Sequence, residues 1–146
     1  MILDGIRHVV RILRVASRAA ERRVGLSAAQ LFVLEKLAEA KCLSLGELAR
    51  QTLTHQSSVS VIVAVLGRRR LLNRQRAKSD SRRLEIRLTE KGRALLANAP
   101  AAAQDQLIDA SERLRPRERA ALARLFGRFL HELGVQPGAP PMLFED

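Results

Sequence analysis

The chain has 146 residues, the usual size of one domain with a single hydrophobic core. Its 26 Lys and Arg side chains against 15 acidic ones give a formal net charge of +11, which indicates a polyanionic partner, with nucleic acid as the first candidate. A single cysteine, Cys42, excludes an intramolecular disulfide and a multi-cysteine zinc site, and no apolar run approaches the roughly 20 residues that span a bilayer, so no membrane is expected as a partner.

Residues 1–24 predict one long amphipathic helix. Apolar side chains recur every three or four positions from Ile2 to about Val24, over an arc wider than one core face needs, which favours a second packing surface such as another subunit. A stripe of arginines runs along the same segment: Arg7, Arg11, Arg14, Arg18 and Arg22. These charges interrupt the apolar run of a secretory signal, so we expect a cytoplasmic protein. The stripe is a solvated face, a contact with a membrane surface, or added charge for DNA.

Residues 27–68 predict three further helices. Ser27 suits the N-cap of a helix that runs to about Ala40, and the capping-box pattern of Ser44–Glu47 opens a short helix after it. Thr54 can cap the next helix, which carries a regular apolar face: Val59, Ile62, Val63 and Leu66. The opposite face is small or polar: Gln56, Ser57, Ser60, Val61, Ala64 and Arg68.

Residues 71–88 predict a basic β-hairpin. In the second half, apolar and charged side chains alternate, which is the pattern of a strand with one buried face. The apolar members are Leu84, Ile86 and Leu88. Residues 71–77 supply the antiparallel partner strand and residues 78–81 the turn. Between residues 68 and 93 the chain has eleven Lys or Arg and three acids, so most of its excess positive charge lies here.

The remaining chain predicts helices and a short irregular tail. Thr89 caps a helix that begins with EKG, and Pro100 interrupts the alanine-rich segment that follows. A last helix starts at Pro116 and ends before Gly134. Residues 135–146 are rich in proline and are expected to be irregular. No linker separates two globular units, so residues 1–146 are expected to form one domain.

Two helices joined by a tight turn, the second with a small polar N-terminal half and a basic hairpin directly after it, are typical of a winged helix-turn-helix. The expected fold class is therefore mainly α, with a two-stranded β wing. The second helix fits the major groove of duplex DNA, while the hairpin lies along phosphates and an arginine at its tip enters the minor groove. The predicted DNA-binding residues are Thr54, His55, Gln56, Ser57, Ser58, Ser60, Arg68, Arg74, Arg76, Lys78, Asp80, Arg82 and Arg83.

Some of these residues have a plainer interpretation. Asp80 is either an acceptor that holds Arg82 and the turn amides in one shape, or an ordinary turn residue. Ser57 and Ser60 either contact base edges or only face solvent.

One set of positions carries a family resemblance. The set consists of Arg74, the Asp-x-Arg of Asp80 and Arg82, and the Leu-Thr-x-x-Gly of Leu88, Thr89 and Gly92. This resembles the wing signature of the MarR family of bacterial transcription regulators, and residues 43–66 are similar to the helix-turn-helix of that family at their apolar and Ser/Thr positions. The order of helices also fits along nearly the whole chain. One position departs: Arg70 stands where related sequences usually have Gly, which predicts a different exit from the recognition helix, with Gly67 as the nearest glycine.

The resemblance implies a homodimer held by residues 1–24 and 93–134, with residues 27–92 as the DNA-binding core. Its two recognition helices would lie about 34–36 Å apart, one turn of DNA, on a near-palindromic operator. The resemblance also implies a repressor whose DNA affinity falls when a small aromatic or phenolic effector enters a crevice between the dimer helices and the winged domain. It implies no cofactor.

The sequence contains few motifs that would indicate another class of function. Nucleophile motifs and phosphate-binding glycine loops are absent, so the protein is not expected to be an enzyme, and His8, His55 and His131 are too far apart to predict a metal site. Cys42 is expected to be a small buried hydrophobe rather than a redox sensor, since peroxide sensors of the family carry their cysteine in the first helix. The chain has no Tyr or Trp, which argues against recognition of single strands by stacking. A non-specific architectural DNA-binding protein is the alternative, because the net charge alone suffices for it.

Overall fold

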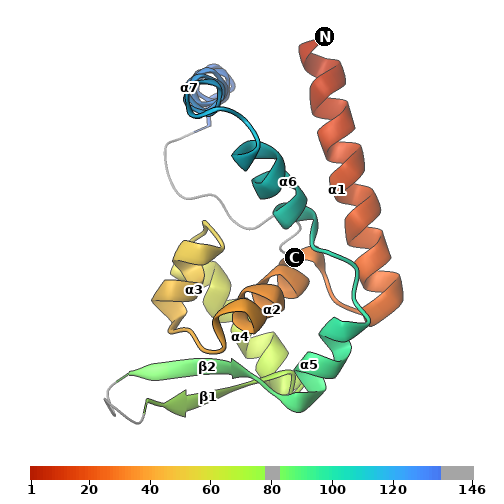
Figure 1. The fold of residues 1–146 in the computed structure, drawn as a ribbon, viewed down its shortest axis with the longest axis vertical. Helices are drawn as coiled ribbons and strands as arrows, with labels where there is room; N and C mark the ends of the chain where they lie inside the picture. Colours follow the sequence, from red (N-terminus) through yellow and green to blue (C-terminus); the bar gives the residue numbers. More distant parts are fainter. Residues whose placement is uncertain (78–82, 136–146) are drawn as a thin grey trace.

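The structure, a computed structural model, describes residues 1–77 and 83–135. In these residues the elements are α1 (Ile2–Val24), α2 (Ala28–Ala40), α3 (Leu45–Gln51), α4 (Gln56–Arg68), β1 (Leu72–Arg76), β2 (Leu84–Leu88), α5 (Glu90–Ala97), α6 (Ala103–Glu112) and α7 (Pro116–Glu132) (Figure 1). The predicted fold class is confirmed, because the chain is mainly helical with one two-stranded antiparallel sheet. None of the helices in the described ranges is both long enough and apolar enough to cross a membrane.

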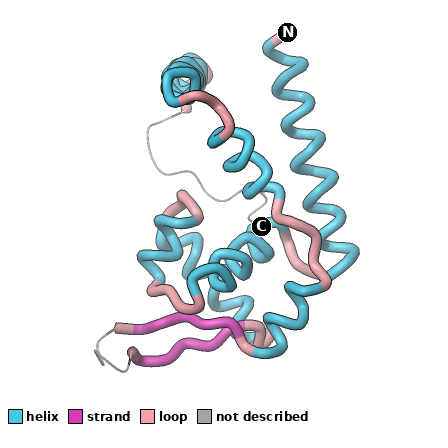
Figure 2. Tube along the Cα trace, in the orientation of Figure 1, coloured by secondary structure: helices cyan, strands magenta, loops and turns pink. Residues whose placement is uncertain are grey.

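The elements from α2 to β2 form a winged lobe, and α1, α6 and α7 extend away from it (Figure 1). The hairpin projects from this lobe, as Figure 2 shows in magenta. The first helix contacts α2 and α6, and α6 also contacts α2. The last helix, α7, has no buried residue. The chain therefore has a packed winged lobe and a more open helical end in its described residues.

The second helix is the centre of the core. Its residues 31–34 are all buried because α2 contacts α1, α3, α4, α5, α6 and β2. A helix that is covered on most sides carries apolar residues on most of its faces, which explains this unbroken apolar run. Burying each such Leu, Val or Phe contributes roughly 1.5–3 kcal/mol relative to leaving it exposed. The core is continued by Leu48, Val59, Val63, Leu66, Leu71, Ile86 and Leu88.

Two of the predicted helix starts are confirmed by their caps. The hydroxyl of Ser27 accepts a hydrogen bond from the backbone N–H of Gln30 at 3.2 Å, and the Gln30 side chain accepts one from the Ser27 N–H in return. In the same way, Ser44 accepts from the Glu47 N–H at 3.3 Å, and the Glu47 carboxylate accepts from the Ser44 N–H at 2.8 Å. Each cap satisfies amide groups that have no partner within the helix, which is worth about 1 kcal/mol.

The predicted cap at Thr54 is wrong by one residue. The N-cap of α4 is His55, whose side chain makes no capping hydrogen bond. The N–H of Thr54 donates to the Ala49 carbonyl at 3.1 Å and so still belongs to the turn after α3. The first hydrogen bond that enters α4 is accepted by the His55 carbonyl from Val59, at 3.2 Å.

The hairpin has the predicted antiparallel pairing, with Leu72 opposite Leu88 and Arg74 opposite Ile86. Its buried face is shorter than the alternation predicted, because Leu84 is 53% exposed. Ile86 belongs to the buried core cluster, and its backbone pairs with that of Leu43 through two hydrogen bonds of 3.1 and 2.8 Å. Leu84, two residues nearer the turn, lies outside this cluster.

The chain leaves α4 through Arg70, whose φ is 60°. This left-handed conformation costs a residue with a Cβ atom roughly 1–2 kcal/mol, and glycine avoids that cost. The backbone of Arg70 thus adopts the conformation that glycine favours. The exit from α4 was predicted to differ from the family pattern, and it differs in that an arginine with a strained backbone stands at this position.

The Thr89 hydroxyl and the tight fit at Gly92 fasten the start of α5 to this exit. Thr89 Oγ1 donates to the Arg70 carbonyl at 2.7 Å, and the Thr89 N–H donates to the Leu71 carbonyl at 3.1 Å. Thr89 Oγ1 also accepts from the Gly92 N–H at 3.0 Å, as the predicted cap of α5. A Cβ atom on Gly92 would lie 2.1 Å from the Leu71 oxygen, so only glycine fits. The Leu-Thr-x-x-Gly pattern thus holds the base of the hairpin against the end of α4.

Candidate nucleic-acid interface

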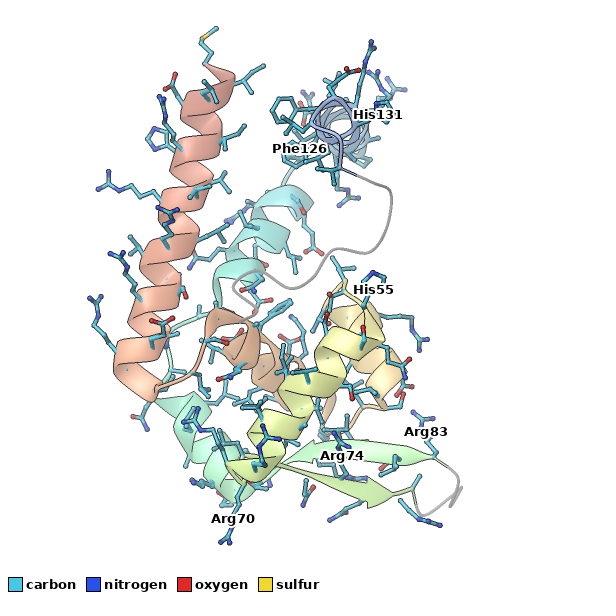
Figure 3. All side chains as sticks on the ribbon, turned by 180° about the vertical axis from the view of Figure 1, so that it is seen from behind. His55, Arg70, Arg74, Arg83, Phe126 and His131 are labelled. Carbon is cyan, nitrogen blue, oxygen red and sulfur yellow. The ribbon has the colours of Figure 1, made fainter. Side chains whose placement is uncertain are left out.

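The fourth helix presents one buried and one open face. Its apolar side chains are buried as predicted: Val59, Ile62, Val63 and Leu66. On the other side, His55, Gln56, Ser57, Val61 and Arg68 are exposed, and Ser58, Ser60 and Ala64 are partly buried. This open face begins at the N-terminal end of α4, where Figure 3 shows His55. Short polar side chains therefore lie at the end of α4 that would enter the major groove of DNA, where they could reach base edges.

Thr54 does not belong to this surface. The residue is only 8% exposed, because the turn that precedes α4 folds it into the lobe. Its contact with DNA stays a prediction, and it lies apart from the open face of α4.

The wing supplies the exposed cations. On β1, every residue from Asn73 to Arg76 is exposed, including the predicted Arg74 and Arg76. Three other predicted residues, Lys78, Asp80 and Arg82, lie outside the described residues. Figure 3 shows Arg74 and Arg83 along the hairpin.

Arg83 has a protein partner that the sequence did not reveal. Its Nη2 atom lies 2.7 Å from both carboxylate oxygens of Glu47, on α3. The same carboxylate accepts hydrogen bonds from the N–H and the hydroxyl of Ser44, each at 2.8 Å. These Ser44 hydrogen bonds, followed by the Arg83 contact, lower the pKa of Glu47 to about 2. Arg83 therefore connects the wing to the helix-turn-helix through an acid that stays ionised at neutral pH.

The three consecutive arginines at the C-terminal end of α4 have different surroundings. Arg68 and Arg70 are exposed, whereas Arg69 Nη1 donates to the Gly25 carbonyl at 2.7 Å. This contact ties the end of α4 to the α1–α2 junction. Only part of the basic run is therefore available to an anionic partner.

Exposed apolar residues also lie on α1 and on α7, both away from the wing (Figure 1). On α1 they are Ile2, Leu3, Val9, Val10, Ile12 and Val15, and on α7 they are Leu122, Leu125 and Phe126. Helical amphipathicity of this kind is normally satisfied by burial against another element.

An open pocket of about 610 Å³ lies between α1 and the segment that leads into α6. Its apolar wall comes from α1, with Ile12 and Val15 among the residues. Its polar groups are His8, Arg11 and Gln106. The pocket therefore combines an apolar lining with a guanidinium group, which suits a small apolar acid.

Neither Cys42 nor the histidines add a site. Cys42 is half-buried, so the expectation of a small buried hydrophobe is met only in part. Among the described residues, no group of three His, Cys, Asp or Glu side chains is arranged to hold a metal ion.

Comparison with known proteins gives a family match and many similar structures. The sequence model of the MarR family matches residues 24–83, from the end of α1 to the residue before β2. No curated protein matches the chain.

Three solved structures illustrate the similarity. A MarR family transcriptional regulator from Streptomyces coelicolor, in complex with DNA, is 25% identical with a TM-score of 0.63, over 97% of this chain and 94% of that one. A probable transcriptional regulator from Pseudomonas aeruginosa is 27% identical with a TM-score of 0.60, over 88% and 96%. BpsR from Bordetella bronchiseptica, whose DNA binding is regulated by 6-hydroxynicotinic acid, is 25% identical with a TM-score of 0.59, over 88% and 97%.

Proposed function

We propose that the chain is a MarR-family transcription regulator that acts in the cytoplasm as a homodimeric repressor of a near-palindromic operator. The family model over residues 24–83 and the similarity to a DNA-bound family member support this proposal. The observation that carries this proposal is the open polar face of α4 beside the exposed arginines of the wing. Short polar side chains on a helix can read base edges in the major groove, and the arginines can neutralise phosphates on either side of it. The relative from Streptomyces coelicolor, which was solved with DNA, supports the same use of this fold.

A dimer is supported by the unpartnered apolar residues of α1 and α7. These helices lie away from the wing in Figure 1, so pairing through them leaves α4 and the hairpin of each protomer free. A two-fold dimer would present two copies of α4 to one face of the duplex, about one helical turn apart.

Selection from random duplexes tests specificity and symmetry together. We expect an inverted repeat whose half-sites are centred about 34–36 Å apart. The double variant Gln56→Ala, Ser57→Ala should change the enriched bases, whereas the matched variant Arg76→Ala should weaken binding and keep the same motif. If no sequence is enriched, the protein is a non-specific architectural DNA-binding protein, and if a single half-site is enriched, it does not bind as a symmetric dimer.

We further propose that the pocket beside Arg11 holds a small aromatic acid that weakens DNA binding. Support comes from the lining of the pocket and from BpsR, whose DNA binding responds to 6-hydroxynicotinic acid. Titrating the protein–operator complex with 6-hydroxynicotinic acid and with benzoate should release DNA from the wild type but not from Arg11→Ala. Equal release from both proteins would place the effector elsewhere. If neither acid releases DNA, small aromatic acids are excluded as effectors.

A further inference from the structure

Val61 is an exposed apolar side chain on the open face of α4. It is 57% exposed, and it is the only large apolar residue of this helix that is exposed to such an extent. Helical spacing places it four residues after Ser57 and seven before Arg68, so the three side chains lie along one stripe. The stripe runs opposite the buried face of Val59, Ile62, Val63 and Leu66.

Stability of the helix does not account for a valine at this place. Its β-branched side chain loses rotamer freedom in a helix and ranks below Ala in helix propensity. An exposed position also returns little of the free energy that burial gives an apolar side chain. Val61 is a single apolar side chain among polar or partly buried neighbours, so it does not form the extended patch that a protein partner requires.

The side chains around Val61 are of the kinds that contact DNA in the major groove. On its N-terminal side are Gln56 and Ser57, which can hydrogen-bond to base edges, and on its C-terminal side is Arg68, which can contact a phosphate. Arg74 of the wing lines one pocket together with Ala64 and Arg68 of this helix, and the exposed Arg76 follows two residues further along β1. An apolar side chain between such groups finds one apolar feature in the groove, the C5 methyl group of thymine.

We propose that Val61 contacts a thymine methyl group and thereby specifies thymine at one position of each operator half-site. This inference rests on the proposed function, because it requires sequence-specific binding of duplex DNA. It follows that cytosine is disfavoured at this position, and that 5-methylcytosine, which carries a methyl group at the same ring position, is favoured over cytosine.

Replacing single thymines of the selected operator by deoxyuridine tests the contact. Deoxyuridine removes only the methyl group and leaves every hydrogen-bonding group of the base pair in place. We expect each half-site to contain one thymine whose single replacement weakens wild-type binding roughly fourfold in a fluorescence anisotropy titration. This is the size of the effect of exposing one methyl-sized group. All other replacements should leave the dissociation constant nearly unchanged.

The variant Val61→Ala should remove this sensitivity, because its side chain is too short to cover the methyl group. Alanine favours the helix, so α4 is expected to stay folded, and a thermal melt checks this. The matched control is Leu84→Ala, which removes an exposed apolar side chain of the same lobe outside α4 and should keep the full response to deoxyuridine. In a third arm, the wild type should bind 5-methylcytosine at the sensitive position about fourfold more tightly than cytosine, and Val61→Ala should not distinguish them.

Two results would overturn the assignment while leaving the proposed function intact. One is an operator in which no deoxyuridine replacement weakens wild-type binding. The other is a methyl effect of the same size in Val61→Ala, which would assign the contact to another residue. A selection that enriches no sequence would overturn the proposed function and, with it, the specificity assigned to Val61.

Discussion

Arg70 is held in its left-handed conformation by hydrogen bonds on both sides. Its N–H donates to the Gly67 carbonyl at 2.9 Å, and its own carbonyl accepts from Thr89 Oγ1 at 2.7 Å. These contacts define the turn from α4 into β1 and hold the backbone where an L-residue is strained. The strain is local, so relieving it should not change the path of the chain.

We expect Arg70→Gly to raise the free energy of unfolding by about 0.5–1 kcal/mol. Glycine removes the steric cost of a positive φ, and its greater freedom in the unfolded chain offsets part of the gain. Urea unfolding at a fixed protein concentration measures the change. The control is Arg68→Gly, at a helical residue two positions earlier, which should lower stability by about 1 kcal/mol. If both variants are less stable than the wild type, the contacts of the Arg70 side chain contribute more to stability than the backbone strain costs.

Gly92 occupies a place where no Cβ atom fits. The Leu71 carbonyl carbon and oxygen would lie 3.1 and 2.1 Å from it, and both are backbone atoms of the turn that leaves α4. We expect Gly92→Ala to lower the free energy of unfolding by about 3 kcal/mol, at the upper end of overpacking effects. Gly127 on α7 has nothing within 4 Å of its Cβ position, so Gly127→Ala should be neutral or stabilising by up to about 1 kcal/mol. Thermal melts of the two variants compare them, and equal losses would contradict the close contact at Gly92.

At the scale of elements, the hairpin and α3 are joined by the Glu47–Arg83 ion pair. Arg83 was predicted to contact DNA, but its guanidinium already contacts Glu47, whose carboxylate also accepts a hydrogen bond from Ser44. A partly exposed ion pair of this kind contributes at most about 1 kcal/mol to stability. Its effect on the direction of the wing, and hence on the position of the wing cations, is the more important consequence.

The salt dependence of DNA binding separates the two roles of wing arginines. Each phosphate contact that is lost should lower the slope of log affinity against log salt by about 1. We expect Arg76→Ala to do so, whereas Arg83→Ala should weaken binding with much less change in slope. Mobility-shift titrations at four salt concentrations measure both slopes. If Arg83→Ala lowers the slope as much as Arg76→Ala, Arg83 leaves Glu47 and contacts a phosphate in the complex.

At the scale of the whole molecule, α6 is joined to the winged lobe through a cluster of charges on α2. Glu35 accepts a hydrogen bond from the Ala102 N–H at 2.9 Å, and Lys36 lies 2.8 Å from Asp105. Lys36 also contacts Glu39, at 3.1 Å. Burial, followed by a hydrogen bond with Asp105, raises the pKa of Glu35 to about 8. This cluster is a joint between the DNA-binding lobe and the helices proposed to form the dimer.

Stability should therefore depend on pH through Glu35. Its folded-state pKa lies above the ordinary value of 4.5, so the folded protein binds this proton more tightly than the unfolded chain does. The contribution is fully present below about pH 4.5 and is lost as the pH rises toward about 8. Urea unfolding at pH 5, 6.5 and 8 should show falling stability for the wild type and a flatter profile for Glu35→Gln. The control Glu132→Gln, on the exposed α7, should follow the wild type, and an unchanged slope in Glu35→Gln would contradict the assignment.

Periodicity and capping residues were enough to predict most of the elements. The bounds of α1 and α2, the capping boxes at Ser27 and Ser44 and the pairing of the hairpin follow from interactions between residues a few positions apart or on facing strands. Such short-range preferences do not depend on the rest of the fold, so they can be recognised in the sequence alone. The open face of α4 was predicted for the same reason.

Only the tertiary structure shows the features that depend on contacts between distant parts of the chain. Arg83 meets Glu47 across 36 positions and Arg69 meets Gly25 across 44, and no local pattern predicts either contact. The exposure of Leu84 depends on where the hairpin leaves the lobe. Such outcomes result from packing between distant segments, which the alternation and spacing of residues do not encode. The sequence by itself thus determined the helices, the wing and the open polar face of α4, while the packing of distant segments decided which of the described arginines have a partner within the protein and which are exposed.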